Sequence, residues 1–101
     1  MVQGIYTSLL GEAGMPDRLE TVRRKLRFRS LRRGTKESDL VIGGFADEHL
    51  HGMTEDQLAA FEALLDENDQ DVLGWVIGMA PPPPAHDTDV LKMIRQFKNS
   101  L

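Results

Sequence analysis

Few residues of this 101-residue chain have both the type and the spacing that chemistry requires. His49 and His51 follow two acids, Asp47 and Glu48, and imidazole and carboxylate groups are common zinc ligands. On a helix, however, residues i and i+2 do not share a face, so the two histidines would not point at one ion. On a strand they would need further ligands from elsewhere in the chain. We therefore expect no metal site.

Nucleophilic and acid–base catalysis have equally little support. No serine lies in a G-x-S-x-G elbow, and Ser30 lies among arginines. Cysteine is absent, which excludes thiol nucleophiles, disulfides and thiolate metal sites. Glu37 and Asp39 would point apart on a helix, and they fit better as acids that stabilise a helix start. The Gly43-Gly44 pair lacks the strand, the spacing and the lysine of a phosphate-binding loop. We predict that the chain is not an enzyme and has no catalytic residues.

The strongest anomaly is a basic segment, residues 23–36, with the sequence RRKLRFRSLRRGTK. At about 100° per residue, Leu26 belongs to an apolar helix face, whereas Phe28 and Leu31 project away from that face among the cations. This pattern indicates one face against the core and a second face against something else. We favour a partner-binding face, but neutralisation by acids of the same chain and binding of nucleic acid stay open.

The charges of the chain are segregated along its length. Residues 1–36 carry a net charge of +6, residues 37–91 carry −13 without any Lys or Arg, and residues 92–101 carry +3. Such a division favours a macromolecular partner or strong internal ion pairing. The length allows one small domain, and no apolar run approaches the roughly 20 residues that span a bilayer. The first 14 residues hold one acid and no base, unlike a targeting leader, so we expect a cytoplasmic protein without membrane insertion.

Capping signals and apolar spacing predict an all-α fold, a compact bundle of five short helices. Asp17 with Glu20 marks the start of a helix near 17–31, and Thr35 can cap a second one. The apolar members of this second helix are Leu40, Val41, Ile42 and Phe45. Because the Gly43-Gly44 pair costs roughly 1 kcal/mol per glycine inside a helix, a short strand at 40–42 competes with the favoured helix.

The second half of the chain has clearer signals. A capping box of Thr54 and Gln57 predicts a helix near 54–67, and Asp69 is expected to cap a short helix that Gly78 ends in a left-handed conformation. This short helix places Trp75 on the core side. Pro81 to Pro84 predict a stiff extended spacer before a last helix, capped by Asp87 or Thr88. The apolar stripe of the last helix is Val90, Ile94, Phe97 and Leu101. We expect residues 1–16 to form a flexible tail and residues 17–101 to form a single domain.

Residues 33–39, with the sequence RGTKESD, resemble the RGxxExD signature of the FAD assembly factors. Those small proteins promote the covalent attachment of flavin to the flavoprotein subunit of succinate dehydrogenase or fumarate reductase. Residues 26–30 resemble the family's arginine-rich entry into the motif, and residues 64–76 resemble its acidic turn and Trp-bearing helix. The resemblance covers about residues 17–98. It implies a five-helix fold, a helical Gly43-Gly44 pair, and a chaperone that binds the flavoprotein but has no cofactor or catalytic role of its own.

The resemblance also implies which residues bind the partner. The motif residues Arg33, Gly34, Glu37 and Asp39 are expected to face the flavoprotein, and a side chain at Gly34 would obstruct close approach or the helix junction. The full set expected to bind the partner is Phe28, Arg29, Arg32, Arg33, Gly34, Glu37 and Asp39. We expect a monomer that does not bind nucleic acid. The alternative is a small nucleic-acid-binding or regulatory module, of toxin/antitoxin type, that uses the same basic helix.

Overall fold

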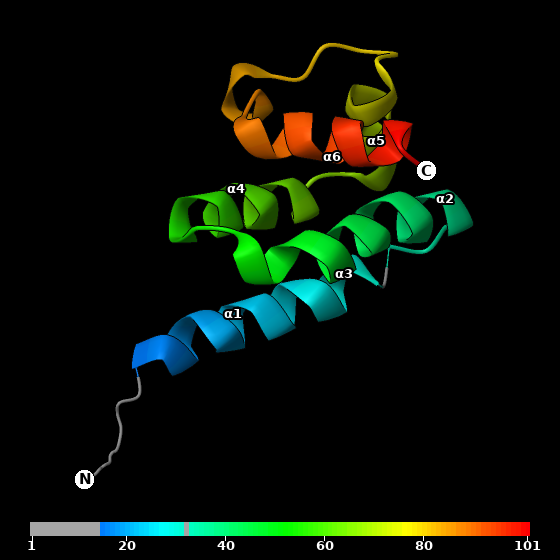
Figure 1. Cartoon of the computed structure of the whole chain (residues 1–101). Helices are drawn as coiled ribbons and strands as arrows, with labels where there is room; N and C mark the ends of the chain where they lie inside the picture. The colour runs from blue at the N-terminus through cyan, green and yellow to red at the C-terminus, as the bar shows by residue number, and fades with distance from the viewer. Residues whose placement is uncertain (1–14, 32) are drawn as a thin grey trace, which may run out of the picture.

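The computed structural model describes residues 15–31 and 33–101, and this part of the chain forms five helical segments and no strand. The first segment is α1, Met15–Ser30, and the second runs continuously through α2, Lys36–Ser38, the wider π-helical turn η1, Asp39–Gly43, and α3, Gly44–His49. The others are α4, Glu55–Leu65, α5, Asp69–Ile77, and α6, Asp89–Asn99 (Figure 1). Single 3₁₀ turns, η2, Leu50–Gly52, and η3, Pro84–His86, join segments. The all-α, five-helix prediction is confirmed. Residues 1–14 of the predicted tail, and Arg32, lie outside the described residues.

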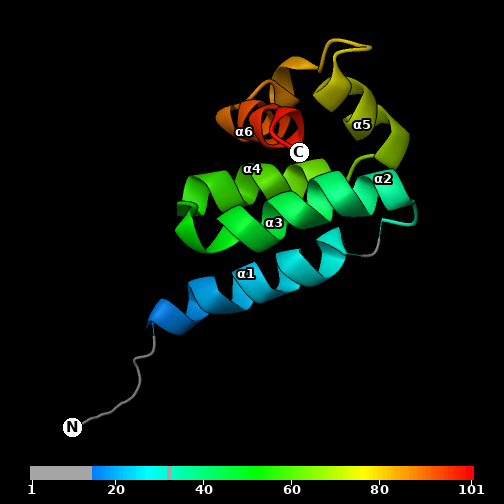
Figure 2. The ribbon, with the colours of Figure 1, turned by 45° about the vertical axis from the view of Figure 1, so that its right-hand side comes forward.

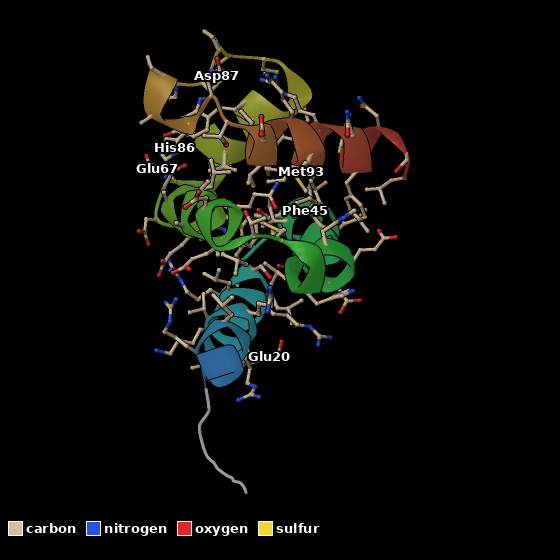
Figure 3. The ribbon with its side chains drawn as sticks, turned by 60° about the vertical axis from the view of Figure 1, so that its left-hand side comes forward. Glu20, Phe45, Glu67, His86, Asp87 and Met93 are labelled. Atoms are coloured by element: carbon tan, nitrogen blue, oxygen red, sulfur yellow. The ribbon has the colours of Figure 1, made fainter. Side chains whose placement is uncertain are left out.

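The helices are arranged in three layers, as Figures 1 and 2 show. The first layer is α1, the second contains α4 beside the α2–η1–α3 segment, and the third contains α5 and α6. Phe45 of α3 lies inside the molecule (Figure 3). Its ring centroid is 5.7 Å from that of Phe61 of α4, which is also fully buried, and 6.1 Å from that of Phe97 of α6. Trp75 is buried as predicted, and it stacks on His86 of η3 at 5.4 Å. Leu26 of α1 belongs to the same buried cluster as Phe45 and Phe61. The three layers therefore share one core, which holds α1 against α3 and α4.

The second segment is helical through its glycine pair, so the competing strand at 40–42 is wrong. Thr35 caps the segment as predicted, because its side chain accepts a hydrogen bond from the backbone N–H of Ser38. A Cβ atom at Gly44 would stand 3.0 Å from the Phe97 ring. The close packing of α6 at this point offsets the poor helix propensity of glycine.

The second segment contains a π-helical turn in its middle. The N–H of Gly44 donates to the carbonyl of Asp39, five residues earlier, which defines the wide turn. Within this turn Val41 and Ile42 are buried, but Leu40 points to solvent and is 60% exposed. Of the four apolar members named for this helix, Leu40 is therefore the one at the surface.

The predicted helix ends are confirmed where the signal is local. The capping box of Thr54 and Gln57 has both of its hydrogen bonds, Thr88 caps α6, and Gly78 ends α5 with a φ of +84°. The prediction of Asp69 as the cap of α5 is wrong, because the side chain of Asn68 accepts from the backbone N–H groups of Gln70 and Asp71.

Three further boundaries differ from the predictions. Helix α1 begins at Met15, two residues before the predicted start at Asp17. Pro84 opens the turn η3, so the extended proline spacer is shorter than expected. Leu101 lies beyond the end of α6 and is exposed, whereas Val90 and Ile94 of the same predicted stripe are buried.

Candidate functional site

Large apolar side chains are exposed on both sides of the connection between α1 and α2. Phe28 of α1 and Leu31, the residue that follows α1, are 57% and 50% exposed, and Leu40 of η1, on the other side of the connection, is 60% exposed. A Cβ atom at Gly43 would stand 3.1 Å from Cδ2 of Leu31, so the end of α1 packs closely against η1. Clustered exposed apolar groups of this kind mark interaction surfaces, and π-helical turns occur often at functional sites. We term this surface the junction face; it consists of Phe28, Leu31, Gly34, Glu37, Asp39 and Leu40.

Phe28 contributes to two open hollows beside the junction. The hollow along α1 has a volume of about 580 Å³ and is lined by Thr21, Arg24, Lys25, Arg27, Phe28 and Leu31. The hollow toward the α4–α5 turn has a volume of about 460 Å³ and is lined by Phe28, Arg29, Arg33, Glu67 and Asp69. Arg24 and Lys25 form no ion pair within the described part of the chain. The first hollow therefore combines an apolar lining with uncompensated positive charge.

Gly34 is exposed at the centre of the junction and has a φ of +98°. That left-handed backbone favours glycine, because an L side chain there is strained. A Cβ atom at Gly34 would have no atom within 4 Å, so a side chain would meet nothing inside this molecule. The expected obstruction of the helix junction is therefore wrong, since the constraint is the backbone conformation. A larger side chain would extend across the junction face.

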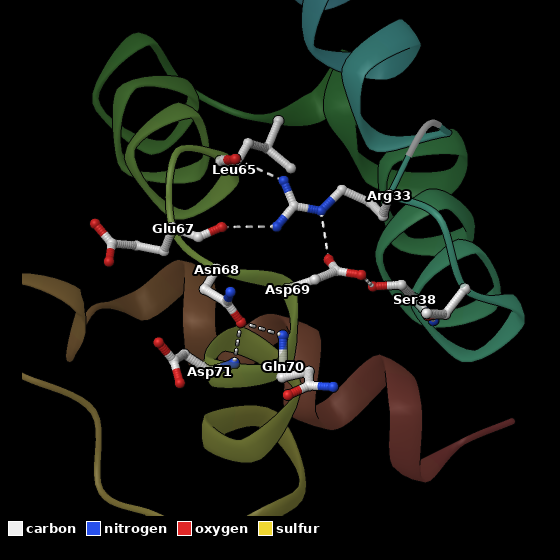
Figure 4. Close-up of polar contacts among 9 residues, drawn as sticks. Arg33, Ser38, Leu65, Glu67, Asn68, Asp69, Gln70 and Asp71 are labelled. Atoms are coloured by element: carbon white, nitrogen blue, oxygen red, sulfur yellow. Dashed lines mark hydrogen bonds and ion pairs between the residues drawn. The ribbon is translucent and has the colours of Figure 1, made fainter.

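The structure turns Arg33 inward, although the family resemblance implies that it faces a partner. Its side chain is only 10% exposed. Nε donates to Oδ1 of Asp69 at 2.6 Å, while Nη1 and Nη2 donate to the carbonyls of Leu65 and Glu67 at 2.5 and 3.1 Å (Figure 4). The other oxygen of Asp69, Oδ2, accepts from the hydroxyl of Ser38 at 2.6 Å. Contact between Arg33 and a partner stays a prediction.

Several other arginines of α1 pair with acids of the middle region, as the internal-neutralisation alternative expects. The pairs at the surface are Arg18–Glu55, Arg27–Asp47 and Arg29–Asp66, at 2.7, 2.6 and 2.6 Å. Exposed pairs of this kind contribute little to stability, typically below 1 kcal/mol each. Internal pairing is therefore observed for Arg18, Arg27 and Arg29, while partner binding by the basic helix stays a prediction.

The residues predicted to bind the partner differ in how far the structure exposes them. Phe28, Gly34, Glu37 and Asp39 are exposed around the junction, and Arg29 lies at its edge in its ion pair with Asp66. Arg32 lies outside the described residues. The predicted set missed Leu31 and Leu40, as well as Ser38 and Asp69. Exposure of Leu31 follows from its angle on α1, but no local pattern pairs Asp69 with an arginine 36 residues away.

His49, which has the residue type of a metal ligand, packs against an aromatic ring. The ring of His49 stacks on Phe45 at a centroid distance of 4.9 Å. Between residues 15 and 101, Arg32 excepted, no three His, Cys, Asp or Glu side chains gather as they would around a metal ion. The same part of the chain contains no helix long and apolar enough to cross a membrane.

A small all-α domain with exposed apolar side chains and uncompensated cations around a helix junction has the features of a protein-binding module. Comparison with known proteins narrows this class, because residues 24–98 match the family model described as "Flavinator of succinate dehydrogenase". The chain belongs to this family, and the resemblance seen in the sequence is confirmed.

Individual relatives agree with the family match. The chain is 38% identical over 77 residues to "Succinate dehydrogenase assembly factor 2, mitochondrial" of Dictyostelium discoideum. This alignment covers 76% of this chain and 55% of that protein. It is 33% identical over 76 residues to the protein of the same name in Drosophila grimshawi, covering 73% and 52%. It is also 37% identical over 76 residues to "FAD assembly factor SdhE" of Acetobacter pasteurianus, covering 75% and 70%. The chain spans about half the length of the mitochondrial relatives.

Proposed function

We propose that this protein is an assembly factor that binds the flavoprotein subunit of succinate dehydrogenase or fumarate reductase and promotes its covalent flavinylation with FAD. The observation that carries the proposal is the family match over residues 24–98, a range that contains the whole junction face. The exposed apolar groups and the unpaired cations beside them support docking through this face.

The junction face has the composition of a docking surface. Phe28, Leu31 and Leu40 together expose three large apolar groups, and burial of each would contribute up to about 1.5–3 kcal/mol before the costs of association. Arg24 and Lys25 extend the face with positive charge, which favours an acidic rim on the partner and speeds encounter. The proposed contacts are Phe28, Arg29, Arg32, Arg33, Gly34, Glu37 and Asp39, with Leu31 and Leu40 added from the structure.

The proposed action is conformational. A bound factor can favour flavinylation only if it binds more tightly to the flavoprotein conformation in which the accepting histidine and FAD are in reacting geometry. In this proposal the chain supplies binding energy and orientation, while the partner supplies the nucleophile and holds the cofactor. The proposal includes no catalytic residue, cofactor or metal for this chain, and it treats the protein as a monomer. The cytoplasmic location stays a prediction, since some relatives are named as mitochondrial.

The test is to express the flavoprotein subunit with and without this protein and to measure covalent flavin by fluorescence in denaturing gels. We expect a clear increase in flavin per flavoprotein when the protein is present. Equal covalent flavin in both cultures would contradict the proposal. A gel shift with duplex DNA at low salt is the counter-test, because binding that falls steeply with added salt would instead support the nucleic-acid alternative.

A further inference from the structure

We infer that Asp69 and Ser38 are positioning residues of the junction face and that they act with Arg33 as an internal clamp. The internal clamp is defined as Arg33, Ser38 and Asp69. The inference rests on the proposed function, since it assigns the geometry of the docking face to residues that hold it from inside. It also gives Arg33 of the RGxxExD motif a role within the molecule.

Arg33 joins the end of α1 to the turn between α4 and α5. Its planar guanidinium directs donors at three acceptors, which are Oδ1 of Asp69 and the carbonyls of Leu65 and Glu67 (Figure 4). Leu65 is the last residue of α4, and its carbonyl is one of those that a helix leaves without an internal donor. A cation is also favourable at that helix end. A lysine could not make this set of contacts, because its ammonium group is a single point of charge.

Asp69 extends the clamp to the other side of the junction. It lies in the first turn of α5, where a carboxylate is favourable, and its side chain is 20% exposed. While Oδ1 accepts from Arg33, Oδ2 accepts from the hydroxyl of Ser38 at 2.6 Å. Ser38 is fully buried and ends α2. One carboxylate therefore holds both ends of the segment 33–38.

The segment between the two held residues is the part of the junction that faces outward. It contains Gly34, in its left-handed conformation, and Glu37. Glycine gives the backbone the most conformational freedom, so a segment with a central glycine would sample many conformations if its ends were released. Fixing the segment before docking reduces the conformational entropy that is lost in the complex. Release of the clamp should therefore weaken binding without removing any contact with the partner.

The experiment compares Ser38→Ala and Asp69→Asn with a matched control, Asp47→Asn. Ser38 is fully buried and cannot touch a partner, and Asp69→Asn keeps the size of the side chain. Asp47 also forms an ion pair with an arginine of α1, at 2.6 Å, but it is 62% exposed and lies outside the junction face. The measurements are amide hydrogen exchange of residues 34–38 in the free chain and the dissociation constant for the purified flavoprotein subunit. Binding is measured at a temperature where circular dichroism shows every variant to be folded.

We expect both clamp variants to exchange at least tenfold faster at residues 34–38 and to bind the flavoprotein at least fivefold more weakly, while Asp47→Asn matches the wild type in both measurements. A merely structural role would lower the melting temperature but leave the affinity of the folded protein unchanged, and that result would overturn the inference. Unchanged exchange at residues 34–38 would also overturn it. If the wild-type chain itself does not bind the flavoprotein, the proposed function fails, and the role of the clamp in docking fails with it.

Discussion

The α1–α2 junction has an inner side and an outer side that differ in almost every physical respect. On the inner side, Arg33, Ser38 and Asp69 are largely buried and bonded to one another or to backbone carbonyls. On the outer side, Phe28 and Leu40 expose more than half of their surface. The inner contacts are polar and within the chain, whereas the outer groups are mainly apolar and open to solvent. In the proposed function, neighbouring residues of one motif therefore serve different purposes, the inner ones in geometry and the outer ones in binding.

This comparison predicts opposite responses to mutation on the two sides. Changes on the inner side should reduce the free energy of unfolding, because they leave buried polar groups without partners. Truncation of the exposed side chains on the outer side should leave stability nearly intact and reduce affinity for the flavoprotein. An outer-side truncation that unfolds the protein, or an inner-side variant that leaves stability unchanged, would contradict this division.

The largest effect is expected for Arg33→Ala. Removing the guanidinium leaves the carboxylate of Asp69 and the carbonyls of Leu65 and Glu67 without their donor, so we expect a loss of about 3 kcal/mol in the free energy of unfolding. Urea titration followed by circular dichroism measures this loss. A change below about 0.5 kcal/mol would mean that the inner side does not contribute to stability.

Gly34→Arg and Gly34→Ala form a matched pair at the centre of the junction. Both incur the same backbone strain at φ +98°, about 1–2 kcal/mol of stability, but only arginine projects across the outer surface. We expect the arginine variant to bind the flavoprotein at least tenfold more weakly than the alanine variant, about 1.4 kcal/mol. Equal affinities of the two variants would show that the outer side of the junction is not in the interface.

Leu40→Ala probes the outer side without altering the clamp. Because Leu40 is exposed in the free protein, we expect a change in stability below about 0.5 kcal/mol. If the side chain is covered in the complex, affinity should fall by about 1 kcal/mol, roughly fivefold. Isothermal titration with the flavoprotein measures this fall, and Met79→Ala, at an exposed site beyond α5, is the control that should change neither quantity.

The smallest effect is expected for Asp47→Asn. Its ion pair with Arg27 has the same 2.6 Å distance as the Arg33–Asp69 pair, but both of its side chains are about 60% exposed. Solvent screening should limit the change in stability to about 0.5 kcal/mol or less, and salt should reduce it further. Thermal melts at low and high salt measure the difference. If Asp47→Asn lost as much stability as Arg33→Ala, the difference in burial could not explain why the two ion pairs contribute differently to stability.

Features that depend on neighbours in the chain were predictable from the sequence. The caps at Thr35, Thr54 and Thr88 are confirmed, since each uses a side chain and a backbone N–H three residues later. The exposure of Phe28 follows from its angle on α1 relative to Leu26, which is buried. These signals act within one or two helical turns, which is the range that a single sequence reveals.

Features that depend on tertiary contacts were not predictable. Asp69 has the residue type and position of a helix cap, but it accepts from Arg33 and leaves the cap to Asn68. The inward direction of Arg33 depends on acceptors more than 30 residues away, so a motif that was expected to lie wholly at the surface has an inner half.

Amide hydrogen exchange of the chain, with and without the flavoprotein subunit of succinate dehydrogenase, tests most directly whether the outer side of the junction is the docking face. The account predicts that binding slows exchange within residues 24–40 and leaves α5 and the proline segment, residues 70–86, unchanged. Protection concentrated in residues 70–86, with none in residues 24–40, would contradict it.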